Sequence, residues 1–427
     1  MHAILTPVGS AGDVNPFVIL GRELRRRGHR VTLTGSAPFA PIVSAAGLEF
    51  LSLATAEDYE RVTNIPDLWH PRRGLEIVLG EIAAGMRRAY KAIAALYEPG
   101  ETMLVGHSLS FFTRVLEETQ HAPAATVHLA PGIFRSDFRP PALPSGADIS
   151  WWPRWAKRAL WWSVDRFALD PLIAPALNAW RAELGLAPVS RVFAEWIHSP
   201  QRVIGLFPDW FADPQPDWLP QIRLAGFALS DPTVAPAGIE TERLDRFLDS
   251  GPPPIVLTAG SANRQAAAFF RATLDAAADV GHRAVCVTGH AADLLSPLPA
   301  GAFHANYASF STLFPRAAAV VHHGGIGTSA QALAGGAPQL VIPMGFDQPD
   351  NAARLVRLGV AAAIPSRRLT RARAASALRR LLTDGGTAAA CQRWRTAMDS
   401  PTAIARVCAL IEEQFARASP ARAAHRS

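Results

Sequence analysis

Short apolar runs rich in β-branched residues alternate with longer amphipathic stretches from the start of the chain. Residues 3–7, 30–34 and 50–53 are predicted strands, and residues 16–27 and 37–46 between them are predicted helices. This alternation predicts a parallel sheet with helices on both faces and with ligands at the carboxyl ends of its strands. Further strands are predicted at 103–106, 124–128, 202–206, 255–258, 284–288, 303–305, 319–321 and 340–343, and further helices at 149–186, 240–250, 265–280, 328–334, 372–382 and 388–416.

The alternation is interrupted once, where prolines and glycines gather around a single short helix. We therefore expect two α/β domains joined by a linker, because a chain of 427 residues can build two separate cores. The predicted parts are an N-terminal domain over residues 1–226, a linker over 227–254, a C-terminal domain over 255–385, closing helices over 386–416 and a disordered polar tail over 417–427.

Composition excludes several classes of protein. The net charge is +6, but charged residues are only 18% of the chain and the basic ones are dispersed, so no nucleic-acid partner is expected. A basic surface still favours contact with anionic lipid. Cys286, Cys391 and Cys408 are few and far apart, which argues against a disulfide framework or a zinc site and suits a reducing cytosol. The sequence shows no signal peptide and no membrane span, so we expect a cytoplasmic protein whose membrane contacts are peripheral.

The segment from Ala319 to Asn351 joins a strand to a Gly-rich loop, a helix and a second strand. Gly324, Gly325 and Gly327 permit a tight turn and bring backbone N–H groups close to a ligand. A helix that begins just after such a turn points its unpaired N–H groups and the positive end of its dipole at the loop. The pattern therefore favours a diphosphate site, although an ordinary βα turn without a ligand is the alternative.

Polar side chains lie on both sides of this loop. His322 and His323 are able to donate hydrogen bonds to phosphate oxygens, and Asp347 and Gln348 carry the groups that hydrogen-bond sugar hydroxyls. The segment as a whole predicts a binding site for a sugar diphosphate.

These motifs resemble the donor-binding signature of family 1 glycosyltransferases of the two-domain GT-B fold. The opening of the chain, MHAILTPVGSAGDV, is similar to the bacterial branch that includes glycopeptide, sterol and rhamnolipid enzymes. The runs PDLWHPRRG, WIHSPQ, LFPDWFA and DNAARLVRLG are most similar to the rhamnosyltransferases of rhamnolipid biosynthesis. The resemblance implies two Rossmann-like domains that face each other across a cleft, with the acceptor on the N-terminal domain, the nucleotide sugar on the C-terminal one, and a last helix that crosses back.

The resemblance makes Asp13 the general base that takes the proton from the acceptor hydroxyl. Asp13 also precedes a predicted helix, so helix capping alone is an alternative role. His107 and His128 are fallback bases, with a structural or acceptor-lining role as the alternative. The acceptor-side residues assigned are Ser10, Gly12, His107, Trp151 and Trp152.

Donor-site roles also follow from the resemblance. Gln331 stands where many relatives have a ribose-binding Glu, and a neutral residue there fits the deoxyribose of a thymidine diphosphate sugar. No Asp-x-Asp pair lies near the signature, so we expect inverting transfer with no metal and no cofactor. The assigned residues are, for the diphosphate, Ser261, His322, His323, Gly324, Gly325, Gly327 and Thr328; for the sugar, Asp347 and Gln348; and for the nucleoside, Tyr307, Ala308 and Gln331.

Six of the eleven tryptophans fall within the predicted helix 149–186. Packing of the helix against a core is the ordinary use of such aromatic residues. An apolar acceptor cleft or a membrane-facing patch are the functional alternatives.

The expected reaction is transfer of L-rhamnose from dTDP-L-rhamnose to the hydroxyl of a 3-(3-hydroxyalkanoyloxy)alkanoate lipid, which gives a mono-rhamnolipid. The partners implied are the nucleotide sugar, the hydroxylated lipid, and peripheral contact with the inner membrane or with the enzyme that synthesises the acceptor. One alternative keeps the fold and mechanism with a sterol, macrolide or other aglycone as acceptor and another nucleotide sugar as donor. A second alternative is a non-catalytic GT-B protein that binds nucleotide or partner proteins.

Overall fold

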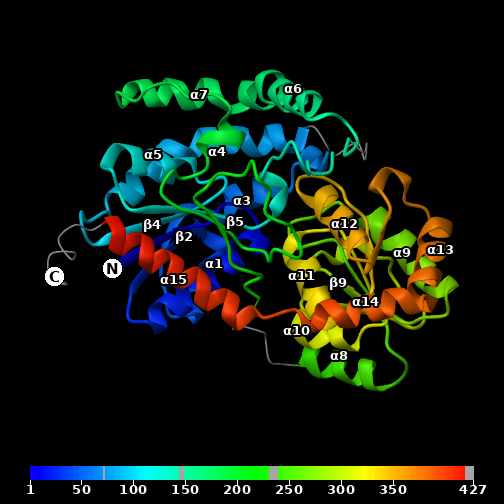
Figure 1. Ribbon diagram of the computed structural model, residues 1–427. Coiled ribbons are helices and arrows are strands. Elements are labelled where there is room, and N and C mark those ends of the chain that lie inside the picture. The colour runs from blue at the N-terminus through cyan, green and yellow to red at the C-terminus, as the bar shows by residue number, and fades with distance from the viewer. Residues whose placement is uncertain (71–72, 144–148, 230–238, 419–427) are drawn as a thin grey trace.

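The computed structural model describes residues 1–70, 73–143, 149–229 and 239–418. These residues form two parallel sheets, each covered by helices on both faces, and the two halves lie side by side (Figure 1). The predicted α/β architecture with two Rossmann-like units is confirmed.

The N-terminal sheet has seven strands in the order β3-β2-β1-β4-β5-β6-β7, all parallel. Ile4 and Leu5 of β1 are fully buried on opposite faces, because successive side chains of a strand alternate. Helices α1 and α15 cover one face, and α4, α5 and α7 cover the other. The strands are β1 (His2–Thr6), β2 (Arg30–Ser36), β3 (Glu49–Ala54), β4 (Thr102–His107), β5 (Ala124–His128), β6 (Val203–Gly205) and β7 (Ile222–Leu224).

The helices of this half are α1 (Ala11–Arg26), α2 (Ala40–Ala45), α3 (Ala56–Thr63), α4 (Arg73–Ala94), α5 (Phe111–Gln120), α6 (Arg154–Val164) and α7 (Asp170–Glu183). Helix α1 begins five residues before its predicted start. Ser10 caps it in a box with Asp13, and Pro16 therefore lies inside the helix.

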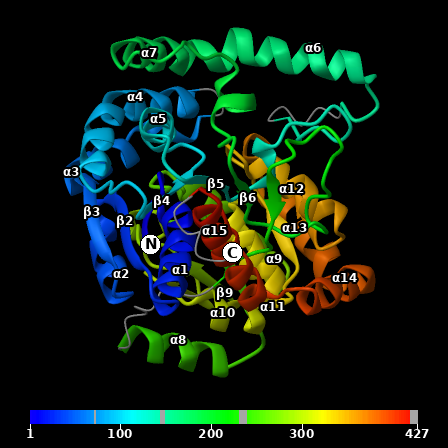
Figure 2. The same cartoon turned by 60° about the vertical axis from the view of Figure 1, so that its left-hand side comes forward.

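The predicted helix over residues 149–186 is two helices rather than one. α6 and α7 are joined by a wider helical turn, Asp165–Leu169, in which the buried Asp165 forms an ion pair with Arg135. The pair of helices forms the outermost layer of this half, and α7 packs on α4 beneath it (Figures 1 and 2).

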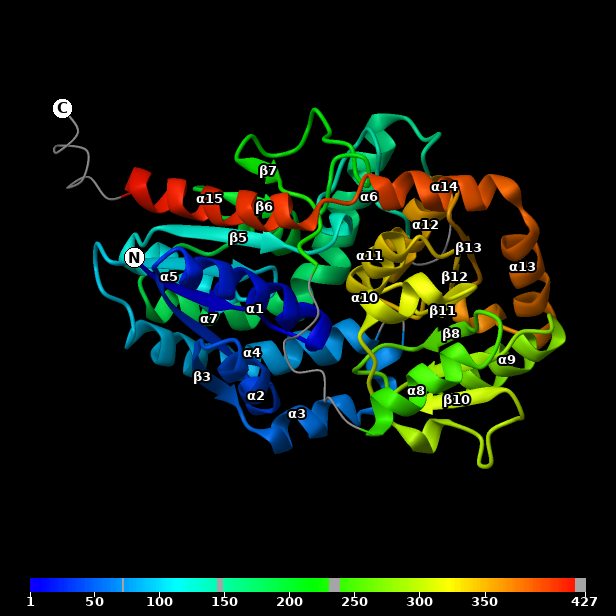
Figure 3. The same ribbon diagram turned by 90° about the horizontal axis from the view of Figure 1, so that it is seen from below.

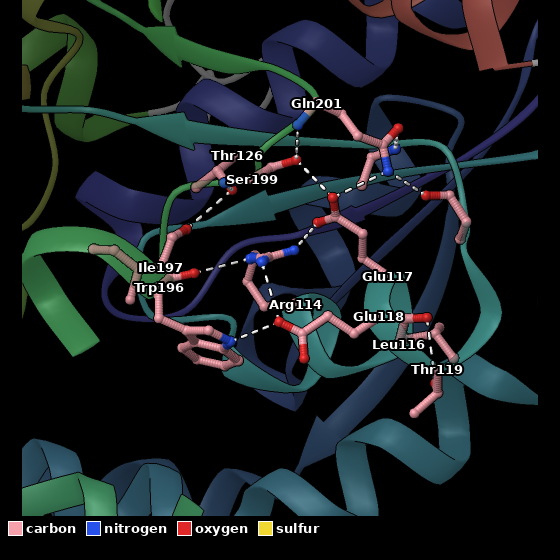
Figure 4. Close-up of polar contacts among 12 residues, drawn as sticks. Arg114, Leu116, Glu117, Glu118, Thr119, Thr126, Trp196, Ile197, Ser199 and Gln201 are labelled. Carbon is pink, nitrogen blue, oxygen red and sulfur yellow. Dashed lines mark hydrogen bonds and ion pairs between the residues drawn. The ribbon is translucent and has the colours of Figure 1, made fainter. Parts of the chain in front are cut away.

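A buried polar network fixes the segment that contains Trp196-Ile197-His198-Ser199 (Figure 4). Arg114 of α5 donates to the Trp196 carbonyl at 3.0 Å and forms an ion pair with Glu117. The Ser199 hydroxyl donates to the same Glu117 at 2.8 Å, and burial raises the pKa of that carboxyl. Because these groups are hydrogen-bonded to one another, the network fixes residues 196–201 against α5.

The C-terminal sheet has six parallel strands in the order β10-β9-β8-β11-β12-β13. Its strands are β8 (Ile255–Thr258), β9 (Ala284–Val287), β10 (Ala302–Ala305), β11 (Ala319–His322), β12 (Gln339–Val341) and β13 (Ala361–Ala363). Its helices are α8 (Ile239–Asp249), α9 (Ala267–Asp279), α10 (Phe310–Leu313), α11 (Ile326–Gly335), α12 (Gln348–Arg357), α13 (Arg371–Thr383) and α14 (Gly385–Thr396).

The last described element is helix α15 (Ser400–Ala418), which lies along the N-terminal half against α1 (Figure 3). The predicted single helix 388–416 is thus divided into α14 and α15, and residues 417 and 418 are helical rather than part of a tail. The rest of the predicted tail and residues 230–238 of the predicted linker lie outside the described residues.

Docking of α15 depends on apolar side chains that face α1. Ile411 is fully buried in the core of the N-terminal half. We expect Ile411→Ala to lower the free energy of unfolding by about 2–5 kcal/mol, because it leaves a cavity in that core. Chemical denaturation measures the loss. The exposed Arg406 of the same helix supplies a control, since Arg406→Ala should change the free energy of unfolding by no more than about 0.5 kcal/mol. Equal effects of the two variants would contradict the packing of α15 on the N-terminal half.

Candidate active site

The order of strands reverses at one point in each sheet. β1 is flanked by β2 and β4, and β8 by β9 and β11, so connections leave toward opposite sides at these positions. Loops at the carboxyl ends of such strand pairs form the ligand crevice of open α/β sheets. Asp13 follows β1, His107 is the last residue of β4, and Ser261 and His323 follow β8 and β11. The topology therefore places the predicted residues at the two crevices.

Asp13 is held by the start of α1. Its Oδ2 accepts hydrogen bonds from the backbone N–H of Ser10 at 2.7 Å and from the Ser10 hydroxyl at 3.1 Å. Gly9, at φ +136°, is required beside it, because a Cβ at this position would lie 2.2 Å from Asp13 Oδ2. Gly12 is exposed, and its N–H donates to the Ser10 hydroxyl at 3.3 Å. The loop from Gly9 to Gly12 thus orients the Asp13 carboxylate.

The second carboxylate oxygen of Asp13 has a different environment. Asp13 Oδ1 lies 3.9 Å from Nε2 of His107, and a third of the Asp13 side chain is exposed to solvent. Burial lowers the pKa of His107, and the charge of Asp13 opposes that shift. Capping and proton transfer are therefore compatible, since they use different oxygens.

His323, in the loop after β11, has a polar atom that the fold does not use. Its ring lies close to both Gly260 and Gly325, where an added Cβ would come within 2.8 and 2.4 Å of ring atoms. Burial lowers its pKa to about 4, so the ring is neutral at pH 7. Among the residues that the structure describes, its Nδ1 has no hydrogen-bond partner. A buried, unpaired ring nitrogen indicates a place for a ligand.

The N-terminus of α11 opens onto the same loop. The helix begins at Ile326 after Gly325, which has no side chain that could cap it, and its first turn has no acidic residue. Gly327 and Thr328 belong to this first turn, so Gly327 is helical rather than part of the tight turn. The tight turn is made by Gly324 at φ +93°, where a Cβ would meet Val341 at 2.9 Å. The free N–H groups and the helix dipole favour an anion here.

His322 does not fit its predicted role as a phosphate donor. It is fully buried, its Nε2 lies 2.9 Å from Oε1 of Gln339, and its Nδ1 accepts the N–H of Gly324 at 3.1 Å. Both ring nitrogens are therefore occupied by the fold. His322 shapes the loop and has no atom free for a ligand.

Asn351 joins the loop after β12 to the turn at Gly324. Its amide donates to the carbonyl of Gly324 at 3.0 Å and to Oδ2 of Asp347 at 2.7 Å. Gln348 is buried, and its Oε1 accepts from the N–H groups of Met344 and Gly345. That oxygen is thus used by the loop, which leaves the Gln348 amide NH₂ group and the second oxygen of Asp347 as the groups for a sugar.

An electrostatic effect, a hydrogen bond and a shared core cluster show that the two halves meet around these loops. Burial raises the pKa of Asp347 to about 6, and the negative charge of Asp13, from the other half, adds to the rise. Arg264, in the loop after β8, donates to Oδ1 of Asn64 at 3.1 Å. The first residues of α1 and α11 also pack on one core cluster. The candidate base and the candidate anion site therefore face a common space.

The residues predicted to bind the nucleoside are not all accessible. Tyr307 is exposed after β10, Ala308 is buried, and Gln331 is half-buried in α11. Ser261 is exposed in the loop after β8, next to Gly260. None of these positions contradicts the predicted roles, which remain predictions.

The predicted acceptor role of Trp151 gains no support from its position and stays a prediction. Its side chain is 77% exposed and packs edge-on against Trp152, which is half-buried. Trp151 lies on the outer surface before α6.

A buried pair of histidines near His107 was not predicted as a unit. The Ser108 hydroxyl lies 2.6 Å from Nδ1 of His128, whose Nε2 lies 2.9 Å from Nδ1 of His198. Burial lowers the pKa of both rings, to about 4 for His198. The neutral pair fixes the Ser108 hydroxyl next to His107. Seventy residues separate the two histidines, so no local pattern reveals their contact.

Comparison with known proteins decides the family. The chain is 32% identical to O-mycaminosyltylonolide 6-deoxyallosyltransferase of Streptomyces fradiae over 448 residues, which covers 97% of each protein. Residues 271–413 match the model of the erythromycin biosynthesis protein CIII-like C-terminal domain. The chain belongs to the family 1 glycosyltransferases.

Solved structures agree with the GT-B fold of this glycosyltransferase. The glycosyltransferase of kitacinnamycin has a TM-score of 0.71 with 22% identity and covers 97% of this chain and 99% of its own. VinC, solved in complex with DTDP, has a TM-score of 0.66 with 18% identity; the match covers 98% of this chain and 100% of VinC. At these identities the likeness concerns the fold alone.

Asp13→Asn separates the two uses of the Asp13 carboxylate. The amide oxygen of Asn still accepts the N–H of Ser10, so the cap of α1 and the melting temperature should be preserved. The base is lost, and release of nucleoside diphosphate in the presence of acceptor should fall by about 10²–10⁴-fold. Full turnover by a folded Asp13→Asn protein would reduce Asp13 to a helix cap.

His323→Ala should weaken thymidine diphosphate binding by about 10- to 100-fold, since it removes a hydrogen bond to a charged group. Binding of thymidine, which has no phosphate, is the control and should not change. A bound anion raises the pKa of His323 from about 4, so binding of thymidine diphosphate takes up protons. The difference in affinity between the wild type and His323→Ala therefore grows as pH falls. Calorimetry in buffers of different ionisation enthalpy measures this uptake; equal uptake by the variant would contradict the assignment.

Proposed function

We propose that this glycosyltransferase moves a sugar from a nucleoside diphosphate to an acceptor hydroxyl with inversion at the anomeric carbon. The observation that carries the proposal is that Asp13 comes close to the loops around the uncapped N-terminus of α11: its charge acts on Asp347, and Asn351 ties Asp347 to Gly324 in the turn before that helix. One side of the space accepts a proton, and the other accommodates a diphosphate.

In the proposed reaction, Asp13 takes the proton of the acceptor hydroxyl as its oxygen attacks the anomeric carbon. The bond between that carbon and the diphosphate oxygen breaks, and the leaving group keeps the electron pair. N–H groups of α11 and a ring N–H of His323 stabilise the negative charge on the diphosphate. Direct displacement inverts the anomeric configuration. The residues carry each step without a metal or a cofactor.

For the donor we propose a thymidine diphosphate 6-deoxyhexose, with L-rhamnose as the first candidate. The neutral Gln331 in α11 fits a deoxyribose, and Asp347 with the amide NH₂ of Gln348 would bind sugar hydroxyls. Two relatives support this class of donor, since one is named for transfer of 6-deoxyallose and VinC was solved with DTDP.

For the acceptor we propose a large apolar molecule with one reactive hydroxyl. The first candidate is a 3-(3-hydroxyalkanoyloxy)alkanoate, which would give a mono-rhamnolipid; it rests on the runs similar to the rhamnolipid enzymes. The second is a macrolide-type aglycone, favoured by the name of the 32% identical relative, which acts on a glycosylated tylonolide.

The test offers both acceptors to the purified chain with dTDP-L-rhamnose. Mass spectrometry is expected to detect one rhamnosylated product, and nuclear magnetic resonance should show a linkage inverted relative to the donor. Asp13→Asn is the matched control and should give no product. Product from the macrolide alone would select the second acceptor. No product from any thymidine diphosphate sugar, with nucleotide binding retained, would refute the proposed enzyme and favour the non-catalytic alternative.

A further inference from the structure

Helix α6 and its flanks carry a concentration of exposed aromatic side chains that the site does not use. Trp151 is 77% exposed, Trp155 73%, Trp162 52% and Phe167 69%. With Phe138, they are five of the nine large apolar side chains that are exposed in the described part of the chain. Single exposed apolar residues are ordinary, but a cluster marks an interaction surface.

The exposed residues of α6 lie on one side of the helix. Trp155, Ala159, Trp162 and Arg166 are exposed at spacings of four, three and four residues, which line up along a helix. The opposite side is fixed by Lys157, which is buried and donates to the Ser150 carbonyl at 2.8 Å. This stripe, with Trp151 and Phe167 at its ends, is called the aromatic face below. Helix α6 belongs to the outermost layer of the molecule (Figure 2).

The charges around the aromatic face are mainly positive. Arg154 lies over the ring of Phe138 at 3.9 Å, and Arg166 over Phe167 at 5.8 Å, so both keep their charge at the surface beside an aromatic ring. Arg158 forms an ion pair with Asp137 at 2.7 Å. The acidic residue of the 150–167 stretch, Asp165, is buried and paired, and therefore adds no negative surface charge.

We propose that the aromatic face binds the surface of an anionic lipid bilayer. Tryptophan rings favour the boundary between headgroups and acyl chains, and arginines beside them bind lipid phosphates. Helix α6 would lie in the plane of the membrane, since no helix of the described residues is long and apolar enough to cross one. A second copy of the chain is a poorer occupant, because a symmetric pair would bring Arg154 and Arg166 against themselves.

The position of α6 connects the membrane contact with the site. Ile149 and Ser150, just before α6, line a cavity of about 430 Å³ together with Pro140, Met344 and Phe346. Met344 and Phe346 belong to the loop before α12 that also carries Asp347. Docking through the aromatic face would therefore bring this cavity close to the lipid surface. The binding proposal itself does not rest on the proposed function, because it concerns residues outside the site.

Vesicle co-sedimentation tests the proposal with the full chain. Wild-type protein should bind vesicles of phosphatidylglycerol and phosphatidylcholine, and bind vesicles of phosphatidylcholine alone at least about tenfold more weakly. The double variant Trp155→Ser, Trp162→Ser should lose at least about tenfold in binding to the anionic vesicles, because two large apolar groups no longer enter the interface. Arg154→Gln with Arg166→Gln should reduce both the binding and its dependence on salt.

The matched control replaces two exposed apolar residues elsewhere, Leu295→Ser and Val356→Ser, and should bind vesicles like the wild type. Transfer to a detergent-dispersed acceptor should be the same in all these variants, so a failed vesicle test and a failed transferase assay are distinguishable. Equal binding by the tryptophan variant and the wild type would overturn the proposal. A second result would also overturn it: a wild-type protein that does not bind vesicles and is a dimer in sedimentation equilibrium, together with a tryptophan variant that is a monomer. The aromatic face would then bind a second copy of the chain.

Discussion

The structure depends on one topological constraint, which is that parallel strands put all their carboxyl ends at one edge of a sheet. In each sheet the strand order reverses there, between β1 and β4 and between β8 and β11. Helix α1 follows β1 and helix α11 follows β11, and each points its N-terminus at the crevice of its sheet. At α1 the positive helix end is matched by Asp13. At α11 the first turn has no acidic residue, so its N-terminus favours an anionic ligand.

Glycines and buried amides make this arrangement possible. The ring of His323 fits only because Gly260 and Gly325 have no Cβ, and the turn before α11 needs Gly324 at positive φ. Asn351 joins the turn at Gly324 to Asp347, so the two parts of the proposed donor site are held by one side chain. Precise placement therefore comes from close backbone contacts and not from long flexible side chains.

Much of this was predictable from the sequence, and what was missed has a common cause. Strands, most helices and the glycine loops follow local periods and turn chemistry, and the GT-B fold followed from the resemblance. The role of His322 depends on Gln339 in the neighbouring strand, and that of His128 on His198, so neither is visible in a local pattern. Trp151 and Trp152 were assigned to the acceptor side because they adjoin a proline-rich stretch, but the 77% exposure of Trp151 depends on how α6 packs, which no local pattern shows.

The most direct test of the central claim is a crystal structure of the chain with thymidine diphosphate bound. The diphosphate is expected to accept hydrogen bonds from the first N–H groups of α11 and from the ring of His323, with Asp13 facing it across an open space. A diphosphate bound instead among the arginines of the neighbouring cavity, such as Arg139 and Arg357, would contradict it.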